Sequence, residues 1–233
     1  MKKRKGMLLF YCLTIIGALI TFRWISRTVT VIAENIPLKR EHCIIIDAGH
    51  GGEDGGATSC AGILESTYNL DISMRLNDLF HLLGYDTRMI RISDISIYTK
   101  GETLSQKKIS DLKERVRITN ETENALLLSI HQNIFSDSQY SGAQVFFAET
   151  EGSEALARQL QSALIGTLNP GSSRQCKKSS GIYLMDHISR TGVLIECGFL
   201  SNPEEESNLR SKDYQQKLSC VIAATVSSFL SNT

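Results

Sequence analysis

Short apolar runs alternate along the chain with longer segments in which apolar residues recur at helical spacing. A short, continuous apolar run is typical of a strand that is buried on both faces of a sheet. Such runs predict strands at 43–46, 87–90, 125–130, 144–147, 182–184 and 193–195. Helical spacing predicts helices over 70–83, 109–122, 155–168 and 214–230. This alternation indicates a single α/β domain with a largely parallel sheet flanked by helices.

Residues at the ends of these segments predict where the helices begin and end. Gly84 follows the first helix and fits a C-terminal stop, because glycine readily adopts the left-handed conformation found there. Ser153 and Ser211 precede the last two helices and are candidate N-caps. The polar stretch 92–106 is expected to be a loop.

The N-terminal segment differs from the rest of the chain. Basic residues 2–5 precede an uncharged run over 6–22, which as a helix would reach roughly 26 Å, close to the thickness of the hydrocarbon core of a bilayer. A membrane anchor and a cleaved signal peptide both fit. Arg23 and Arg27 separate the run from a candidate cleavage site at 31–33 and favour the anchor. The predicted organisation is a targeting segment at 1–27, a linker at 28–42 and a catalytic body at 43–230, outside the cytoplasm.

Charge and cysteine content narrow the classes of function. Six Lys and Arg precede the first acidic residue, Glu34, and the remainder carries 19 basic against 25 acidic residues. A mildly acidic body argues against nucleic acid as the partner, because phosphate binding needs clustered Lys and Arg. The six cysteines show no C-x-x-C spacing and are expected to be free thiols.

Four residues that could carry chemistry follow predicted strands or precede a predicted helix. His50, His131 and Glu196 come after three different strands, and Glu65 lies just before the first helix of the body. Because functional groups collect beyond the carboxyl ends of parallel strands, these side chains are expected to converge. Two imidazoles and one carboxylate form a common catalytic zinc set, and a further carboxylate such as Glu196 can transfer protons.

Each of these residues also has a purely structural interpretation. The histidines could be hydrogen-bonding loop residues, Glu65 could complement the dipole of its helix, and Glu196 could form an ion pair with a nearby Lys or Arg. No compact zinc motif such as H-E-x-x-H links them, so spacing alone leaves both interpretations open.

Two other chemistries are less well supported. The glycine-rich loop 49–56 could cradle phosphate, but Asp54 occupies the third glycine position of G-x-G-x-x-G and no Walker lysine follows. Cys197 could be a nucleophile, but neighbours on a strand point in opposite directions, so it faces away if Glu196 faces the site.

Three motifs and one glutamate stand out in the body: Asp-Ala-Gly-His-Gly-Gly (47–52), Glu65, Ser-Ile-His-Gln-Asn (129–133) and Val-Leu-Ile-Glu-Cys-Gly-Phe-Leu-Ser-Asn (193–202). Together they resemble the zinc-dependent N-acetylmuramoyl-L-alanine amidases of the third amidase type. The similarity spans 43–230. It implies a roughly six-stranded twisted sheet, one zinc ion and hydrolysis of the muramoyl–L-alanine amide of peptidoglycan. The implied roles are zinc ligands at His50, Glu65 and His131, a catalytic glutamate at Glu196, and substrate-contacting or supporting residues at Asn133 and Arg115.

A catalytic domain behind a membrane-targeting segment looks most like the germination-specific, spore-cortex branch of this family. That branch removes stem peptides so that a later deacetylase can form muramic-δ-lactam, which implies action at the forespore membrane or cortex. The resemblance allows for an activating protein partner without requiring one. The alternatives are a zinc peptidase that cuts within the stem peptide and a non-catalytic wall-binding protein.

Overall fold

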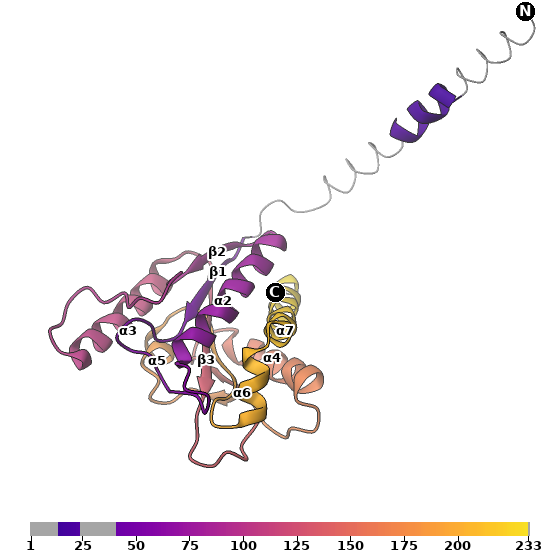
Figure 1. Ribbon diagram of the computed structural model, residues 1–233. Coiled ribbons are helices and arrows are strands. Elements are labelled where there is room, and N and C mark those ends of the chain that lie inside the picture. The colour runs from indigo at the N-terminus through magenta and orange to yellow at the C-terminus, as the bar shows by residue number, and fades with distance from the viewer. Residues whose placement is uncertain (1–13, 24–40, 233) are drawn as a thin grey trace, which may run out of the picture. The chain divides into compact units, whose positions relative to one another are not determined.

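The computed structural model describes residues 14–23 and 41–232 (Figure 1). The chain divides into two units, 1–39 and 40–233. In the first unit, residues 14–23 are helical. Within the described ranges, no helix is long and apolar enough to cross a membrane. Most of the predicted targeting segment and nearly all of the predicted linker lie outside the described residues.

The second unit is built on one six-stranded sheet in the order β2-β1-β3-β6-β4-β5. All neighbours pair in parallel except β4 and β6, which are antiparallel. The prediction of a largely parallel α/β sheet is therefore confirmed. The strands are β1 (Cys43–Ala48), β2 (Asp86–Met89), β3 (Ala125–Asn133), β4 (Gln144–Phe147), β5 (Lys177–Lys178) and β6 (Thr191–Phe199).

Helices cover both faces of the sheet. Helices α2 (Glu65–Leu82), α4 (Ser153–Leu168) and α7 (Lys212–Ser231) pack on one face, where α7 lies beside α2 and α4 (Figure 1). Helices α3 (Leu104–Glu121) and α5 (Tyr183–His187) cover the other face. Helix α6 (Pro203–Arg210) follows β6. Central strands are thus buried on both sides, which explains their continuous apolar sequences.

The structure corrects one predicted strand. The run 182–184 is not a strand: Tyr183–His187 form the short helix α5, and Ile182 is its N-cap residue. The missing strand is the exposed pair Lys177–Lys178 at the sheet edge. A three-residue apolar run carries no periodicity that separates strand from helix. Two lysines on an edge strand carry no apolar signal at all.

Some helix ends also differ from the predictions. Ser153 is not an N-cap, because Gly152 caps α4 in the left-handed conformation and the Ser153 hydroxyl accepts a hydrogen bond from Gly192 N. The polar stretch 92–106 is not entirely loop, since α3 begins at Leu104 behind a capping box made by Thr103 and Gln106. Helix α6 was not predicted. The N-cap at Ser211 and the stop at Gly84 are confirmed.

Candidate metal centre

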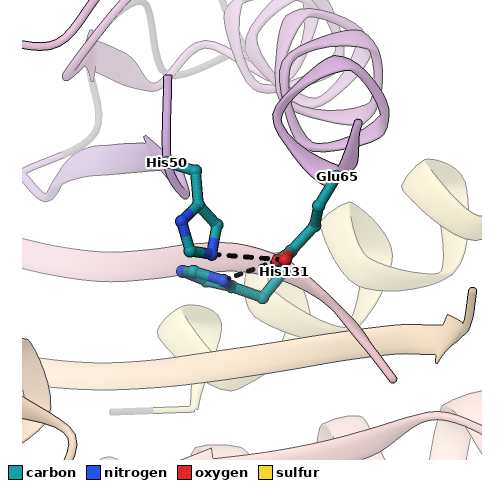
Figure 2. A group of neighbouring side chains, drawn as sticks. All are labelled: His50, Glu65 and His131. Atoms are coloured by element: carbon teal, nitrogen blue, oxygen red, sulfur yellow. Dashed lines mark hydrogen bonds and ion pairs between the residues drawn. The ribbon is translucent and has the colours of Figure 1, made fainter. Parts of the chain in front are cut away.

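The carboxyl edge of the sheet brings together the residues that the sequence singled out (Figure 2). His50 lies just past β1, and Glu65 is the first residue of α2. His131 and Glu196 lie within β3 and β6 rather than after them, and they are direct partners across the two strands. Partners in a sheet point to the same face, so Glu196 stands beside His131. The expected convergence of the four residues is observed.

His50, Glu65 and His131 form a compact group of ligand-type atoms. Glu65 Oε2 lies 3.3 Å from His50 Nε2, and Glu65 Oε1 lies 3.0 Å from His131 Nδ1. The two imidazole rings meet edge to face with centroids 4.9 Å apart. One atom from each residue lies within 4.8 Å of the other two, and the three could hold a metal ion together. Two imidazoles with one carboxylate match the donor set of catalytic zinc sites.

Glu196 supplies a carboxylate that the surrounding protein does not satisfy. Its Oε2 oxygen is buried and has no hydrogen-bond partner among the described residues. Burial raises the pKa of Glu196 to about 7, although the nearby His131 opposes this shift. A buried, unpartnered carboxylate oxygen calls for a ligand, because leaving it unmet costs free energy. The pKa suits a group that accepts and returns protons near neutrality.

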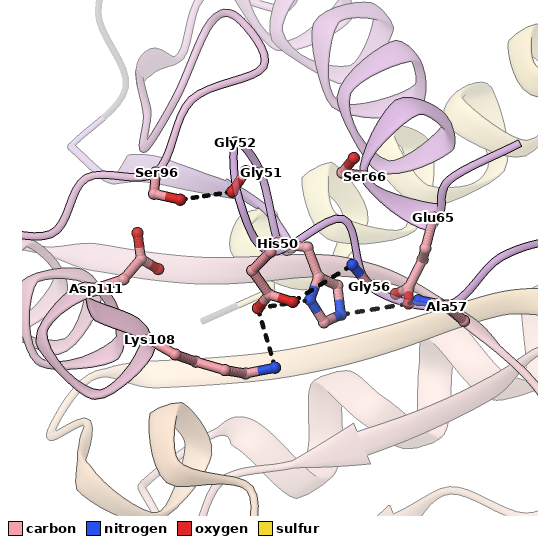
Figure 3. A network of polar contacts seen from close by, with 12 residues as sticks. His50, Gly51, Gly52, Gly56, Ala57, Glu65, Ser66, Ser96, Lys108 and Asp111 are labelled. Carbon is pink, nitrogen blue, oxygen red and sulfur yellow. Dashed lines mark hydrogen bonds and ion pairs between the residues drawn. The ribbon is translucent and has the colours of Figure 1, made fainter. Parts of the chain in front are cut away.

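The carboxylate of Asp54 orients the first histidine, His50, which Figure 3 shows within its network of polar contacts. Asp54 Oδ2 lies 3.0 Å from His50 Nδ1, which leaves His50 Nε2 to face Glu65. Burial alone would lower the pKa of His50, but hydrogen bonds to Asp54 and Glu65 raise it to about 9. Lys108 lies 3.0 Å from the same Asp54 oxygen. A carboxylate behind a histidine is the usual support of a metal-binding imidazole.

Glu65 is held by both histidines and by the protein backbone. Ala57 N donates to Glu65 Oε2 at 3.0 Å, and Gln132 N donates to Oε1 at 3.1 Å. Burial opposes ionisation, but the hydrogen bonds from His131 and His50 hold the pKa of Glu65 well below its usual range. Glu65 is therefore a carboxylate at neutral pH, as a metal ligand must be.

Arg115 lies beneath the His50 loop. Its guanidinium donates to Asp47, to Asp111 and to the carbonyl oxygens of Ala48 and His50. The residue is 3% exposed, so its donors serve the protein interior, which favours a supporting role over contact with substrate. His50 has a φ of 61°, which is rare for a residue other than glycine, and these hydrogen bonds help to hold it there.

The remaining predicted site residues lie close by or point away. Asn133 is half-buried at the end of β3, where the register shifts against β6. Cys197 is 1% exposed in the apolar core, and burial raises the pKa of its thiol. It faces away from Glu196, as predicted. Asp47 and Asp54 were not proposed as site residues, although both stand within four residues of His50.

Substitution of Gly49 tests how tightly the His50 loop packs on His131. A Cβ atom at this position would lie 2.2 Å from Cε1 and Nε2 of the His131 ring. We expect Gly49→Ala to displace the ring and to weaken metal binding by about tenfold or more. Zinc affinity measured by competition with a chelator checks this. Gly166→Ala is the control, because its Cβ would meet nothing within 4 Å. Equal affinity in both variants would contradict the prediction.

An α/β sheet that presents a His-Glu-His group beside a free carboxylate at its carboxyl edge fits the class of metal-dependent hydrolases. The family model described as N-acetylmuramoyl-L-alanine amidase matches residues 44–228. The chain belongs to this family, and it is an enzyme that hydrolyses the amide between muramic acid and L-alanine in peptidoglycan.

Individual relatives agree with this assignment. The germination-specific N-acetylmuramoyl-L-alanine amidase of Bacillus subtilis is 37% identical over 181 residues, which cover 77% of this chain and 76% of that protein. The CwlD amidase of Clostridioides difficile, solved in complex with the GerS lipoprotein, is 34% identical with a TM-score of 0.79 and covers 83% of this chain and 100% of its own. A second amidase, from Clostridium difficile 630, is 27% identical with a TM-score of 0.71 and covers 82% and 98%.

Proposed function

We propose that this amidase is zinc-dependent, with His50, Glu65 and His131 as the ligands and Glu196 as the proton-transfer residue. The observation that carries the proposal is the group of three ligand atoms within 4.8 Å of one another, next to a carboxylate oxygen of Glu196 that no described residue hydrogen-bonds. The donor types fit zinc, and Asp54 supplies the outer support that zinc-binding histidines use.

Each residue has a definite task in the proposed reaction. When bound, zinc would activate the attacking water and polarise the scissile carbonyl. Glu196 accepts a proton from that water and returns it to the nitrogen of L-alanine as the amide breaks. The products are a free lactyl carboxylate on muramic acid and a peptide with a free amino terminus. We propose that Asn133, at the end of β3, contacts the substrate or supports His131.

We further propose that the enzyme acts outside the cytoplasm, at the forespore membrane or cortex, and is held to a membrane by its N-terminal segment. The germination-specific relative from Bacillus subtilis supports the spore assignment. In that setting the free lactyl carboxylate is the substrate from which a deacetylase-dependent step forms muramic-δ-lactam. The relative solved with a lipoprotein supports an activating protein partner here as well.

Metal removal tests the proposed cofactor. We expect a chelator to abolish peptide release from purified peptidoglycan and added zinc to restore it, because without the metal nothing lowers the pKa of the attacking water toward neutrality. His131→Ala should be inactive, whereas His187→Ala, at an exposed position in α5, should match the wild type. Full activity in chelator-treated, metal-free protein would overturn the zinc proposal.

Mass spectrometry of the products identifies the bond that is cut. The amidase releases intact stem peptides and leaves peptide-free muramic acid on the glycan. A zinc peptidase would leave shortened stems attached to the glycan. Spore-type and vegetative peptidoglycan, compared side by side, test the cortex assignment, and we expect faster release from spore-type material.

A further inference from the structure

Arg91 is a buried arginine whose guanidinium binds the main chain beside two of the proposed metal ligands. It follows β2 and is 2% exposed. Four hydrogen bonds use its guanidinium, and every one ends on a main-chain carbonyl. They run from Nε to Ala48 O at 2.8 Å, from Nη1 to Ser93 O at 3.0 Å, and from Nη2 to Gly49 O at 3.1 Å and Ser66 O at 2.8 Å.

Three of the four accepting carbonyls, those of Ala48, Gly49 and Ser66, belong to the segments that carry two of the proposed ligands. Gly49 immediately precedes His50, and Ser66 immediately follows Glu65. A single nitrogen, Arg91 Nη2, therefore joins the His50 loop to the first turn of α2. Figure 3 shows the side chains of His50 and Glu65 pointing toward each other from these two segments.

The two segments are also joined by main-chain hydrogen bonds, from Glu65 N to Ala57 O at 2.8 Å and from Ser66 N to Gly55 O at 3.0 Å. The His50 loop is irregular, and His50 itself has a left-handed backbone conformation. The amide of Asn69 donates to Gly49 O at 3.1 Å and to Glu65 Oε1 at 3.3 Å, so a second, neutral side chain spans the same gap. Arg91 supplies the charged and rigid part of this connection, because a guanidinium presents its donors in a fixed plane.

Arg91 also helps to set the position of the third ligand. The stretch 48–49 that it holds lies against the ring of His131, so close that Gly49 has no room for a side chain. A shift of this stretch would therefore move His50 and release the contact on His131 together. This buried cation thus binds main-chain atoms next to His50 and Glu65 and, through Gly49, affects the packing of the His131 ring.

We propose that Arg91 is a positioning residue of the metal centre, which sets the separation of His50 and Glu65 by bridging the carbonyls of Gly49 and Ser66. This rests on the proposed metal site. Loss of the bridge allows the ligand atoms to separate and weakens metal binding. Lysine has one nitrogen in place of the fork and cannot reach all four carbonyls, so it restores the function only in part.

The test compares metal binding in three full-length chains: wild type, Arg91→Met and Arg91→Lys. Zinc affinity is measured by competition with a chelator, and the visible absorption of Co²⁺ reports the geometry of the ligands. We expect Arg91→Met to bind zinc about 10- to 100-fold more weakly with an altered Co²⁺ spectrum, as for other residues that support metal ligands. Arg91→Lys should fall between the two.

Arg190→Met is the matched control for the loss of a guanidinium that binds carbonyls. Arg190 is half-buried and immediately precedes β6, and its guanidinium donates twice to the carbonyl oxygen of Asn120 in α3. It therefore lies at the amino end of β6, whereas the metal centre lies at the carboxyl ends of the strands. The Arg190→Met protein should lose thermal stability while keeping wild-type zinc affinity. Wild-type affinity and Co²⁺ spectrum in folded Arg91→Met or Arg91→Lys would overturn the role of Arg91. Failure of the wild type itself to bind zinc or Co²⁺ would instead overturn the proposed metal site.

Discussion

Glu196→Gln is expected to lower the rate of peptide release by about 10²- to 10⁴-fold, the usual contribution of a general acid–base residue. Glutamine has nearly the same size as glutamate but cannot accept a proton. The three proposed ligands keep their positions, because Glu196 makes no hydrogen bond to them. Zinc content should therefore stay near one per chain while the chemistry fails. Peptide release at saturating peptidoglycan and metal analysis on the same sample measure both.

Glu206→Gln is the control for this substitution. Glu206 is another buried carboxylate, but it binds the Tyr68 hydroxyl and Arg210, away from the metal centre. We expect it to lose some stability and to keep its catalytic rate. Undiminished activity in Glu196→Gln would remove Glu196 from the mechanism. Loss of zinc from that variant would show that Glu196 acts as a ligand instead.

Asp47→Asn is expected to lower the free energy of unfolding by about 3 kcal/mol, near the lower end of the cost of breaking a buried ion pair. Asp47 is 1% exposed and accepts hydrogen bonds from Arg115 and from the Ser129 hydroxyl. Asparagine removes one of the two carboxylates that pair with the buried Arg115 and leaves the pair with Asp111. Denaturant unfolding at neutral pH measures this loss. The control is Asp71→Asn on the exposed face of α2, which should change the free energy of unfolding little.

The same substitution should change how stability depends on pH. Burial alone would raise the pKa of Asp47, but Arg115 and Ser129 hold it below its usual value in the folded protein. A lowered folded-state pKa stabilises the protein above the unfolded-state pKa, about 3.9 for an aspartate, and that stabilisation is lost as the pH falls further. The difference in the free energy of unfolding between wild type and Asp47→Asn should therefore become smaller as the pH falls from about 5 to about 3. A difference that stays constant over this range would contradict the prediction.

Much of the fold followed from apolar patterning because the central strands are buried on both faces. The runs at 43–46, 125–130 and 193–195 lie in β1, β3 and β6, the three neighbouring strands at the centre of the sheet. Patterning failed where burial was not the cause of the structure. The strand Lys177–Lys178 is exposed at an edge, and α5 is too short to show helical spacing.

The candidate site was predictable in its residue types and only partly in its connections. Strand ends and the family motifs pointed to His50, Glu65, His131 and Glu196. Nothing in the sequence marked Arg91, because a lone arginine after a short strand resembles any solvated charge. Its importance depends on carbonyls 25 to 43 residues away in the chain, and only folding brings them within reach.

By itself the sequence determined the three central strands, the four long helices that flank the sheet, the acidic character of the body and the set of side chains able to bind a metal. These properties depend on local periodicity and side-chain chemistry, which act over a few residues. The tertiary structure alone decided that two histidines and a glutamate share one small volume, and that Glu196 Oε2 is buried there without a hydrogen-bond partner in the described part of the chain. It also decided that the buried Arg91 and Arg115 donate to the main chain of the His50 loop. Such relations arise from contacts between distant segments, and their distances are set by packing.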